Sequence, residues 1–378
     1  MNFKIIKLPI KAKNDLLACG ADLKNTFALV SGDKMYVSSI NGDLQNLDNF
    51  LEYERNIGAA IKGLNIRPRL ICCDLHPEYF SSKFAVSLAK KHKLPVEFIQ
   101  HHHGHVASCM FENGETGKGI GIAFDGTGYG TDGSIWGAEF LKFDYKNFKR
   151  LVQLKYIPLA GGDKAILEPW RLTATWLYSI YKDKLLDLKI DFIKKMSRKK
   201  WLVIKQMLDK DINSPLSSSM GRLFDAVSAL IGLKDVVEYE AQAAIELEQK
   251  ASQFYPQDLA SYKFRIEKRD NLIINPEAIF PQIIADLKNK EEIGKIALKF
   301  HYTIAVMIKE ACLLIRKKEG LNKVFLSGGV FQNKILTEKA VELLKKAGFQ
   351  IFIHLTSPND SCISIGQAII GINRRPRN

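Results

Sequence analysis

Short apolar runs alternate with amphipathic segments along the first part of the chain. The pattern predicts strands at 16–30, where a Gly-Ala-Asp turn separates two of them, and at 34–40, 69–74 and 96–100, and helices at 44–64 and 79–92. In the helix at 44–64, the apolar side chains Leu47, Phe50, Leu51, Ile57 and Ile61 fall on one side. Strands that alternate with helices in this way predict an α/β lobe.

The second part of the chain repeats this organisation. Strands are expected at 119–125, 134–143, 262–274, 323–327 and 350–354, and helices at 168–182, 183–215, 217–232, 240–254, 293–317, 337–347 and 365–372. Each part opens with a strand, a turn rich in glycine and aspartate, and another strand. The repeat predicts duplicated α/β lobes, with residues 1–115 as the N-terminal lobe, closed by 356–378, and residues 116–355 as the C-terminal lobe.

Length and composition fit a two-lobed globular protein. The chain has 378 residues, of which 46% are hydrophobic and 25% charged, and it shows no apolar run that could span a bilayer. The N-terminus lacks the apolar core of a signal peptide, and the six cysteines form no C-x-x-C pair. We therefore expect a cytoplasmic protein with no membrane partner.

The formal net charge of +14 leaves two interpretations open. Basic runs such as 194–200 and 316–318 are typical of solvated helix faces. The same charge could attract nucleic acid, an acidic protein or a polyphosphate. No basic stripe interleaved with aromatic residues, as in proteins that bind single strands, is visible in the sequence.

Four histidines stand within five residues directly after the strand expected at 96–100: His101, His102, His103 and His105. On a helix, His101 and His105 share one face, where both imidazoles could bind one metal ion. The residue types alone do not decide which two histidines are ligands. The cluster predicts a metal site.

Two glycine-rich segments follow predicted strands. Asp125-Gly126-Thr127-Gly128 offers backbone N–H groups without Cβ atoms, which suits phosphate oxygens, and Asp125 could hold a cation. The alternative is an ordinary hairpin turn. Gly328 and Gly329 follow a buried strand and precede a helix near Asn333, which is a natural place for a nucleotide.

Two further segments carry candidate charges. Lys164 and Arg171 follow a glycine turn, and Arg171 could bind a phosphate in bidentate fashion, although surface ion pairs explain such residues equally well. The turn 357–360 is typical of a helix cap unless the chain closes back onto the histidines. In that case Cys362 would lie close to the site.

These segments together resemble a known family. GADLKNTFAL, CDLHPEYFSS, QHHHGHVAS, GIAFDGTGYGTDGSIWGAEF, GGDKAILEPWR, SSSMGRLFDAVSALIGL, LSGGVFQNKIL and SPNDSCISIGQA occur in order from about 16 to 372. The set resembles the C-terminal carbamoyltransferase region of the hydrogenase maturation factor HypF. The resemblance implies the actin/sugar-kinase fold of two α/β lobes. TsaD-type enzymes, which transfer threonylcarbamoyl to tRNA, and antibiotic O-carbamoyltransferases share that fold.

The resemblance implies roles for most of these residues. The implied metal ligands are His101, His105 and Asp360, with Asp125 to complete the set; iron or zinc suits such ligands, and magnesium suits them less. The implied nucleotide-binding residues are Gly126, Thr127, Gly128, Gly328, Gly329 and Asn333, with Gly221 and Asp225 at the ribose. The candidate catalytic residues are Asp125, Lys164 and Arg171.

The implied reaction moves a carbamoyl group from carbamoyl adenylate, made from ATP, to the C-terminal cysteine of a HypE-like partner. Its product would serve the synthesis of the cyanide ligand of [NiFe] hydrogenase. The alternatives are carbamoyl or threonylcarbamoyl transfer to tRNA or to a small-molecule hydroxyl, and a nucleotide-binding regulator without turnover.

The sequence also departs from the family. Acylphosphatase, zinc-finger and YrdC-like domains, which normally precede this region, are missing, so a split subunit served by a separate YrdC-like protein, an excised domain and a standalone paralogue are all expected alternatives. Ser361-Cys362 replaces two glycines, and Ala241 replaces another glycine. These side chains could narrow a ligand loop.

Overall fold

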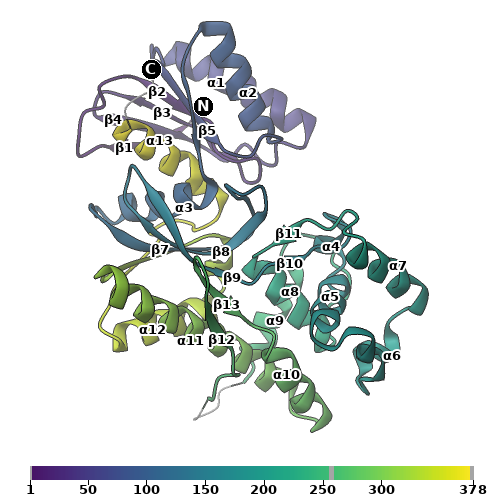
Figure 1. The fold of residues 1–378 in the computed structure, drawn as a ribbon. Coiled ribbons are helices and arrows are strands. Elements are labelled where there is room, and N and C mark those ends of the chain that lie inside the picture. The colour runs from purple at the N-terminus through teal and green to yellow at the C-terminus, as the bar shows by residue number, and fades with distance from the viewer. Residues whose placement is uncertain (1, 255–258, 375–378) are drawn as a thin grey trace.

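Two β-sheets organise the chain, and two helices lie between them (Figure 1). The computed structural model describes residues 2–254 and 259–374. The end of the predicted closing segment, residues 375–378, lies outside the described residues. None of the helices in the described part of the chain is long and apolar enough to cross a membrane.

The first sheet has six strands in the order β1-β4-β3-β2-β5-β6. They are β1 (Phe3–Lys7), β2 (Leu16–Ala18), β3 (Ala28–Ser31), β4 (Lys34–Ser38), β5 (Leu70–Asp74) and β6 (Val96–Ile99). The strand pairs β1–β4, β4–β3 and β3–β2 are antiparallel. The pairs β2–β5 and β5–β6 are parallel. The helices α1 (Leu47–Gly63) and α2 (Phe80–His92) cover one face of this sheet through Tyr53, Ile57 and Ala85.

The second sheet has nine strands, seven of them in the order β12-β13-β9-β8-β7-β14-β15. These are β7 (Gly119–Tyr129), β8 (Ile135–Phe143), β9 (Phe148–Leu154), β12 (Arg265–Lys268), β13 (Leu272–Asn275), β14 (Lys323–Ser327) and β15 (Gln350–Ile353). The short strands β10 (Ile157–Pro158) and β11 (Leu216–Ser217) pair with each other, and β11 joins β8.

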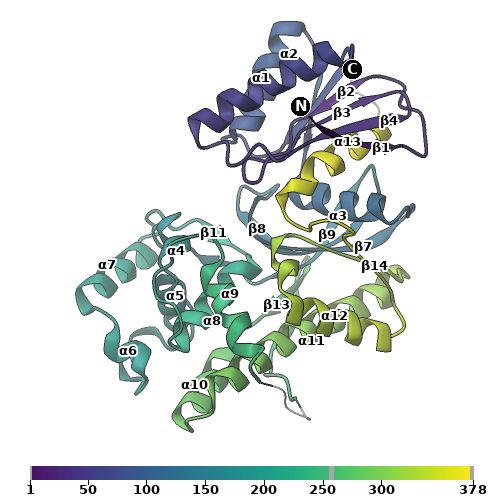
Figure 2. The same cartoon turned by 180° about the vertical axis from the view of Figure 1, so that it is seen from behind.

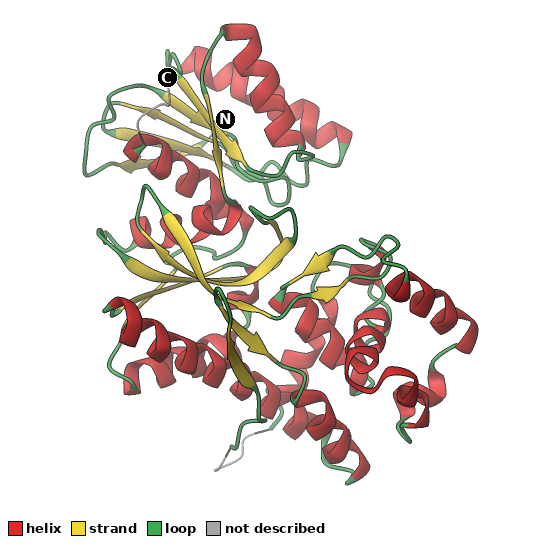
Figure 3. Cartoon of the chain, viewed as in Figure 1, coloured by secondary structure: helices red, strands yellow, loops and turns green. Residues whose placement is uncertain are grey.

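Helices surround the second sheet, and those between residues 164 and 209 form a group to one side of it (Figures 2 and 3). The helices are α4 (Lys164–Leu167), α5 (Trp170–Tyr181), α6 (Asp191–Lys195), α7 (Arg198–Asp209), α8 (Met220–Leu230), α9 (Gln242–Ala251), α10 (Ile279–Lys288), α11 (Ile293–Glu319) and α12 (Lys334–Lys346), with 3-10 turns η1 (Lys182–Asp187), η2 (Gly329–Gln332) and η3 (Asp360–Cys362). Their apolar faces share one large core with the sheet, which includes Trp176, Phe224 and Phe300.

The helices α3 (His101–Glu112) and α13 (Ile363–Asn373) pack against each other between the sheets. A Cβ atom on Gly366 would lie 1.9 Å from the carbonyl oxygen of Gly104, so the close approach of the two helices requires glycine there. Apolar side chains of α13 such as Ile369 pack on the first sheet, whereas Val106 and Met110 of α3 pack on the second. The pair of helices, which includes the candidate metal helix α3, thereby connects the two sheets.

The main difference from the sequence-based expectations concerns the glycine-rich turn. The predicted turn that begins at Asp125 is part of a strand, because β7 continues to Tyr129 through a β-bulge between Phe124 and Gly128. The hairpin turns only after this strand. The strands β1 and β9 and the helix α10 were not expected. The predicted lobe limits at 115 and 355 stay a prediction.

Candidate metal and nucleotide site

The four histidines of α3 have different surroundings. The side chain of Gln100 caps the helix by accepting the N–H of His103, and its amide nitrogen lies 3.0 Å from Nδ1 of His102. The Nε2 atom of His103 lies 2.7 Å from the carbonyl oxygen of Asp144. These contacts involve one ring nitrogen of His102 and one of His103, whereas His101 and His105 lie on the face turned toward β7 and η3.

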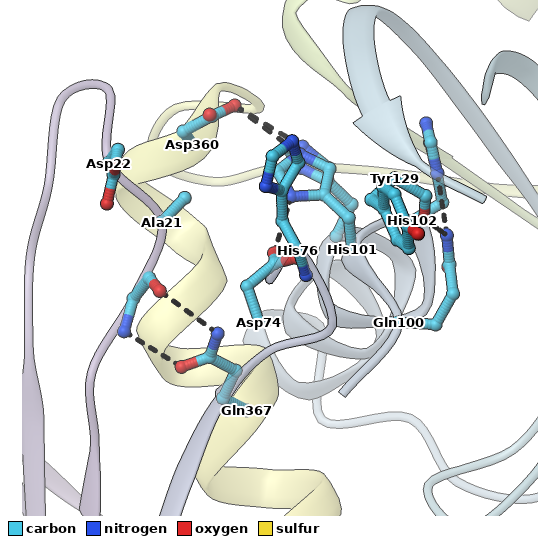
Figure 4. Close-up of polar contacts among 12 residues, drawn as sticks. Ala21, Asp22, Asp74, His76, Gln100, His101, His102, Tyr129, Asp360 and Gln367 are labelled. Carbon is cyan, nitrogen blue, oxygen red and sulfur yellow. Dashed lines mark hydrogen bonds and ion pairs between the residues drawn. The ribbon is translucent and has the colours of Figure 1, made fainter. Parts of the chain in front are cut away.

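Four side chains converge at this face: His101, His105, Asp125 and Asp360, whose ligand atoms all lie within 4.8 Å of one another. Nε2 of His105 lies 3.0 Å from Oδ2 of Asp125 and 3.6 Å from Oδ1 of Asp360. Nε2 of His101 lies 3.4 Å and 3.9 Å from the same two oxygens. Figure 4 shows His101 between Asp74 and Asp360. The segment after β15 therefore does close back onto the histidines.

The donor set fits a divalent metal ion. Nε2 of His101 is buried and makes no hydrogen bond with any described residue, so a polar atom points into the cluster without a partner. Such atoms are rare in proteins because a buried polar group without a partner costs about 1–3 kcal/mol. Two imidazole nitrogens and two carboxylate oxygens are ligands that suit zinc or iron.

The proximity of these groups perturbs the pKa values of His101, His105 and Asp125. Burial by itself lowers the pKa of His101, but the carboxylates of Asp74, Asp125 and Asp360 outweigh burial and raise it to about 10. Burial likewise raises the pKa of Asp125, yet the nearby imidazoles of His101 and His105 bring it well below its usual range. Without a metal ion, positive imidazoles are thus held against negative carboxylates.

Asp74, at the end of β5, was not singled out from the sequence. Its Oδ2 atom lies 2.7 Å from Nδ1 of His101, so it can hold the Nδ1–H tautomer and leave Nε2 for a metal ion. β5 runs parallel to β6, whose end leads directly into α3. Because the carboxyl ends of parallel strands meet at one edge of a sheet, the buried strand ending in an aspartate was a usable signal.

Asp125 is positioned by the irregular part of β7. Its Oδ1 accepts the N–H of Gly126 at 2.8 Å, and its carbonyl oxygen accepts the hydroxyl of Ser219 at 2.8 Å. A Cβ atom on Gly128 would lie 2.4 Å from Cε1 of His102, so this glycine lets the strand approach α3. Thr127, between the two glycines, is half-buried.

A cavity of about 300 Å³ opens beside the four-residue cluster. It is lined by residues that belong to the first sheet's loops and by residues of β7, α8, α9 and η2 around the second sheet. Asp125 and Asp360 belong to its lining, so the cluster and the cavity are one continuous site. The other lining residues include the predicted Gly126, Gly221, Asp225, Gly329 and Asn333, and also Lys24, Arg222, Phe224, Glu240, Glu248 and Gln332, which the sequence did not single out. Leu23 and Lys24 line the cavity from the turn between β2 and β3.

The predicted nucleotide residues have specific partners. Gly329 lies close to Asp125, since a Cβ atom on it would be 3.1 Å from Oδ1 of that residue. Asn333 caps α12 through the N–H of Leu336, and its amide nitrogen lies 2.9 Å from Nε2 of His301. Gly328 adopts a φ of +94° and packs on the backbone of Phe124 rather than lining the cavity.

Arg222 and Asp225 form a buried ion pair on α8, with 2.7 Å between Nε and Oδ2. Burial nevertheless raises the pKa of Asp225, and the guanidinium of Arg222 only partly opposes this. Gly221, next to Arg222, packs directly on Gly126, because a Cβ atom would lie 3.1 Å from the Cα atom of that residue. The motif around Gly221 therefore supplies both close packing and a buried cation.

Lys164 and Arg171 do not belong to this arrangement. They lie on α4 and α5, and neither is among the described residues that line the cavity. Arg171 binds Glu168, with 2.5 Å between Nε and Oε2, and donates to the carbonyl oxygen of Ala160 at 3.3 Å. Their catalytic role stays a prediction from the sequence.

Comparison with known proteins identifies the relatives of this chain. The family model described as "Carbamoyltransferase, Kae1-like Domain, second subdomain" matches residues 121–367, and that described as "HypF Kae1-like domain" matches residues 11–112. A carbamoyltransferase HypF from Synechocystis sp. is 35% identical over 98% of this chain and 49% of its own length. A carbamoyltransferase HypF homolog from Cupriavidus necator is 31% identical over 93% of this chain and 90% of its own length.

Solved structures agree with these relatives. The crystal structure of full-length HypF in the phosphate- and nucleotide-bound form superposes with a TM-score of 0.91 and 39% identity, over 98% of this chain and 57% of that chain. The structure of T.kodakarensis HypF gives a TM-score of 0.87 and 30% identity, over 97% of this chain and 48% of that chain.

The two sheets, with α3 and α13 between them, define a Kae1-like protein of the actin/sugar-kinase class, which confirms the predicted fold class. The chain belongs to the HypF carbamoyltransferase family. It spans about half the length of the first curated relatives it matches.

Proposed function

We propose that this chain transfers a carbamoyl group from carbamoyl adenylate to the C-terminal cysteine thiol of a HypE-like partner protein. The product would enter the synthesis of the cyanide ligand of [NiFe] hydrogenase. One observation carries the proposal: Asp125 and Asp360 belong both to the candidate metal cluster and to the lining of the cavity. A bound adenylate would thus lie directly beside the metal ligands. Family membership supports the reaction class.

In this reaction, the chain's own residues bind and orient the adenylate. The backbone N–H groups near Gly329 and the buried guanidinium of Arg222 suit the phosphate, since fixed dipoles and charge stabilise anionic oxygens. A metal ion held by His101, His105, Asp125 and Asp360 would supply Lewis-acid polarisation.

The bond changes follow from the substrate. The thiolate sulfur of the partner attacks the carbonyl carbon of the carbamoyl group, a C–S bond forms, and the C–O bond to the phosphate of AMP breaks. AMP leaves as an anion. The nucleophile comes from the partner, so the chain needs no nucleophilic side chain of its own in the cavity.

The adenylate would be supplied by a YrdC-like activity, from a separate protein or from a longer form of this chain. The first curated relatives are about twice as long as the part that matches. An assay therefore requires ATP, labelled carbamoyl phosphate, a YrdC-like activating protein and an acceptor peptide that ends in cysteine.

Label on the peptide thiol is the expected result. Variants His101→Ala and Asp360→Ala should lose transfer, whereas His92→Ala, at the exposed end of α2, should keep it. Full transfer by His101→Ala and Asp360→Ala would contradict the proposed role of the cluster. If adenylate is present and the peptide remains unlabelled, the proposed acceptor is wrong, and tRNA or a small-molecule hydroxyl becomes the acceptor to test.

A further inference from the structure

A buried cysteine contacts the far edge of one candidate metal ligand. Sγ of Cys362 lies 3.4 Å from Nδ1 of His105. On the opposite edge of the same ring, Nε2 lies 3.0 Å from Asp125 and 3.6 Å from Asp360. The imidazole is therefore held at both nitrogens, with carboxylates at the edge that faces the cluster and sulfur at the edge that faces away from it.

The second histidine of the pair has an equivalent arrangement. Nδ1 of His101 lies 2.7 Å from Asp74, while its Nε2 points into the cluster. Metal-binding histidines commonly donate the N–H of their outer nitrogen to an acceptor, which fixes the tautomer and the orientation of the ring. Within the described ranges, Cys362 is the hydrogen-bond partner found at the outer nitrogen of His105.

Cys362 occupies a short turn that also carries a candidate ligand. The 3-10 turn η3 contains both Asp360 and Cys362, so one turn contacts the two edges of the His105 ring. Cys362 itself is only 2% exposed. Its sulfur is thus placed by the fold and excluded from solvent, as the geometry of a positioning contact requires.

The helix α3 also anchors the segment before this turn. Glu112 follows His105 by about two helical turns and therefore lies on the same side of α3. Its carboxylate accepts the N–H of Leu355 at 2.9 Å and the hydroxyl of Thr356 at 2.5 Å, and it lies 3.0 Å from Nδ1 of His354. The segment from β15 to η3 is thereby attached to α3 at one end through Glu112 and at the other through His105.

We propose that Cys362 is a positioning residue for the metal site: its sulfur accepts the Nδ1–H of His105, so that Nε2 of this ring is presented to the metal ion in its unprotonated form. The role rests on the metal site of the proposed function, but not on the identity of the acceptor. No bond is made or broken at the sulfur.

The test is the affinity of the full chain for Zn²⁺, measured by competition with a chromophoric chelator. Cys362→Ala removes the acceptor and should weaken Zn²⁺ binding by about tenfold or more. Cys362→Ser keeps an acceptor on Cβ and should recover part of this loss. Cys109→Ala is the matched control, because its buried sulfur on α3 faces the carbonyl oxygens of Leu326 and Phe352 instead. It should leave the affinity unchanged.

Two results would overturn this role. One is a Zn²⁺ affinity of Cys362→Ala equal to that of the unaltered chain. The other is a sulfur-to-metal charge-transfer band in the Co²⁺-loaded chain that disappears in Cys362→Ala, since the sulfur would then be a ligand itself. If the unaltered chain binds no Zn²⁺, the metal site and this role fall together. Because the readout is metal affinity, a failure of carbamoyl transfer alone leaves the result of this test standing.

Discussion

The absence of a side chain at Gly128 makes space for the imidazoles of His101 and His102. Gly128 of β7 lies against α3, where a Cβ atom would be 2.4 Å from Cε1 of His102 and 3.0 Å from Cδ2 of His101. Real Cβ atoms essentially never come within 2.4 Å of another side chain, so any larger residue must push His102 or the strand away. The glycine that was expected to belong to a phosphate loop is therefore required by the packing of β7 on α3.

Gly128→Ala is expected to weaken Zn²⁺ binding by about tenfold or more, because His101 can keep its geometry only if β7 moves. Chelator competition measures the change. Gly58→Ala, in the exposed middle of α1, is the control: a Cβ atom there meets nothing within 4 Å, and the exchange should raise stability by about 1 kcal/mol. Unaltered affinity in Gly128→Ala would show that the strand adapts without cost.

A second residue-scale prediction concerns pH. Burial lowers the pKa of His301 to about 4, against the hydrogen bond of Nδ1 to the carbonyl oxygen of Ala297. The folded chain thus binds this proton less well than the unfolded chain, where the pKa is near 6.5. The stability that His301 contributes is fully present above pH 6.5 and is lost as the pH falls toward 4.

The loss can reach ~3 kcal/mol from this side chain, since one pKa unit corresponds to 1.36 kcal/mol. Urea unfolding between pH 7.5 and pH 4.5 measures it, with His301→Gln as the comparison, because glutamine does not titrate. The unaltered chain should lose more stability than the variant over this range. Parallel losses in both proteins would contradict the assignment.

At the scale of elements, one helix cap also contacts a residue of the candidate metal site. Ser219 caps α8 by accepting the N–H of Arg222, and its hydroxyl donates to the carbonyl oxygen of Asp125. Asn46 caps α1 through the N–H groups of Asp48 and Asn49, on an exposed part of the first lobe. Both side chains accept backbone N–H groups at the first turn of a helix, but of these two caps only Ser219 also contacts a candidate metal ligand, Asp125.

Ser219→Ala and Asn46→Ala should each lower the free energy of unfolding by about 1 kcal/mol, as loss of a helix cap usually does. Only Ser219→Ala should also weaken nucleotide and Zn²⁺ binding, by several-fold, because Asp125 loses a restraint. Chemical denaturation and calorimetric titration separate the two effects. Equal nucleotide and metal affinities in both variants would contradict the connection between α8 and the site.

At the scale of the whole molecule, the cavity is bordered by both lobes. Lys24, in the turn between β2 and β3, lies 3.7 Å from Glu240, which precedes α9, and both side chains line the cavity. Each is about half exposed, so the pair adds little to the stability of the fold. Its position predicts an effect on closure of the lobes over a nucleotide instead.

Lys24→Glu places two like charges across the cavity and should weaken nucleotide binding by a few-fold at low ionic strength, with a smaller effect at high salt. The double variant Lys24→Glu/Glu240→Lys restores opposite charges and should recover part of the loss. Isothermal titration at two salt concentrations measures both. No recovery in the double variant would show that Lys24 contacts the nucleotide itself.

Much of the framework was accessible from local patterns. The helical spacing of Phe50 and Ile57 and the buried strand at 70–74 follow from periodicity, which depends on neighbours in sequence. The continuation of β7 beyond Asp125 could not be predicted from the sequence. The glycines after Asp125 indicate a turn, but the hydrogen-bonded pairing with β8 keeps them in a strand. The residue types alone did not show which two of the four histidines face the cluster; the family resemblance implied His101 and His105.

By itself, the sequence determined the α/β class, the order of most elements, and the histidine-rich and glycine-rich motifs. Each of these is encoded over a few adjacent residues. Only the tertiary structure decided that Asp74 and Cys362 contact the outer nitrogens of His101 and His105, and that Lys24 reaches the cavity. Cys362 and His105 are 257 positions apart. Such contacts arise from the packing of α3 on α13 between two sheets, and no local period specifies that packing.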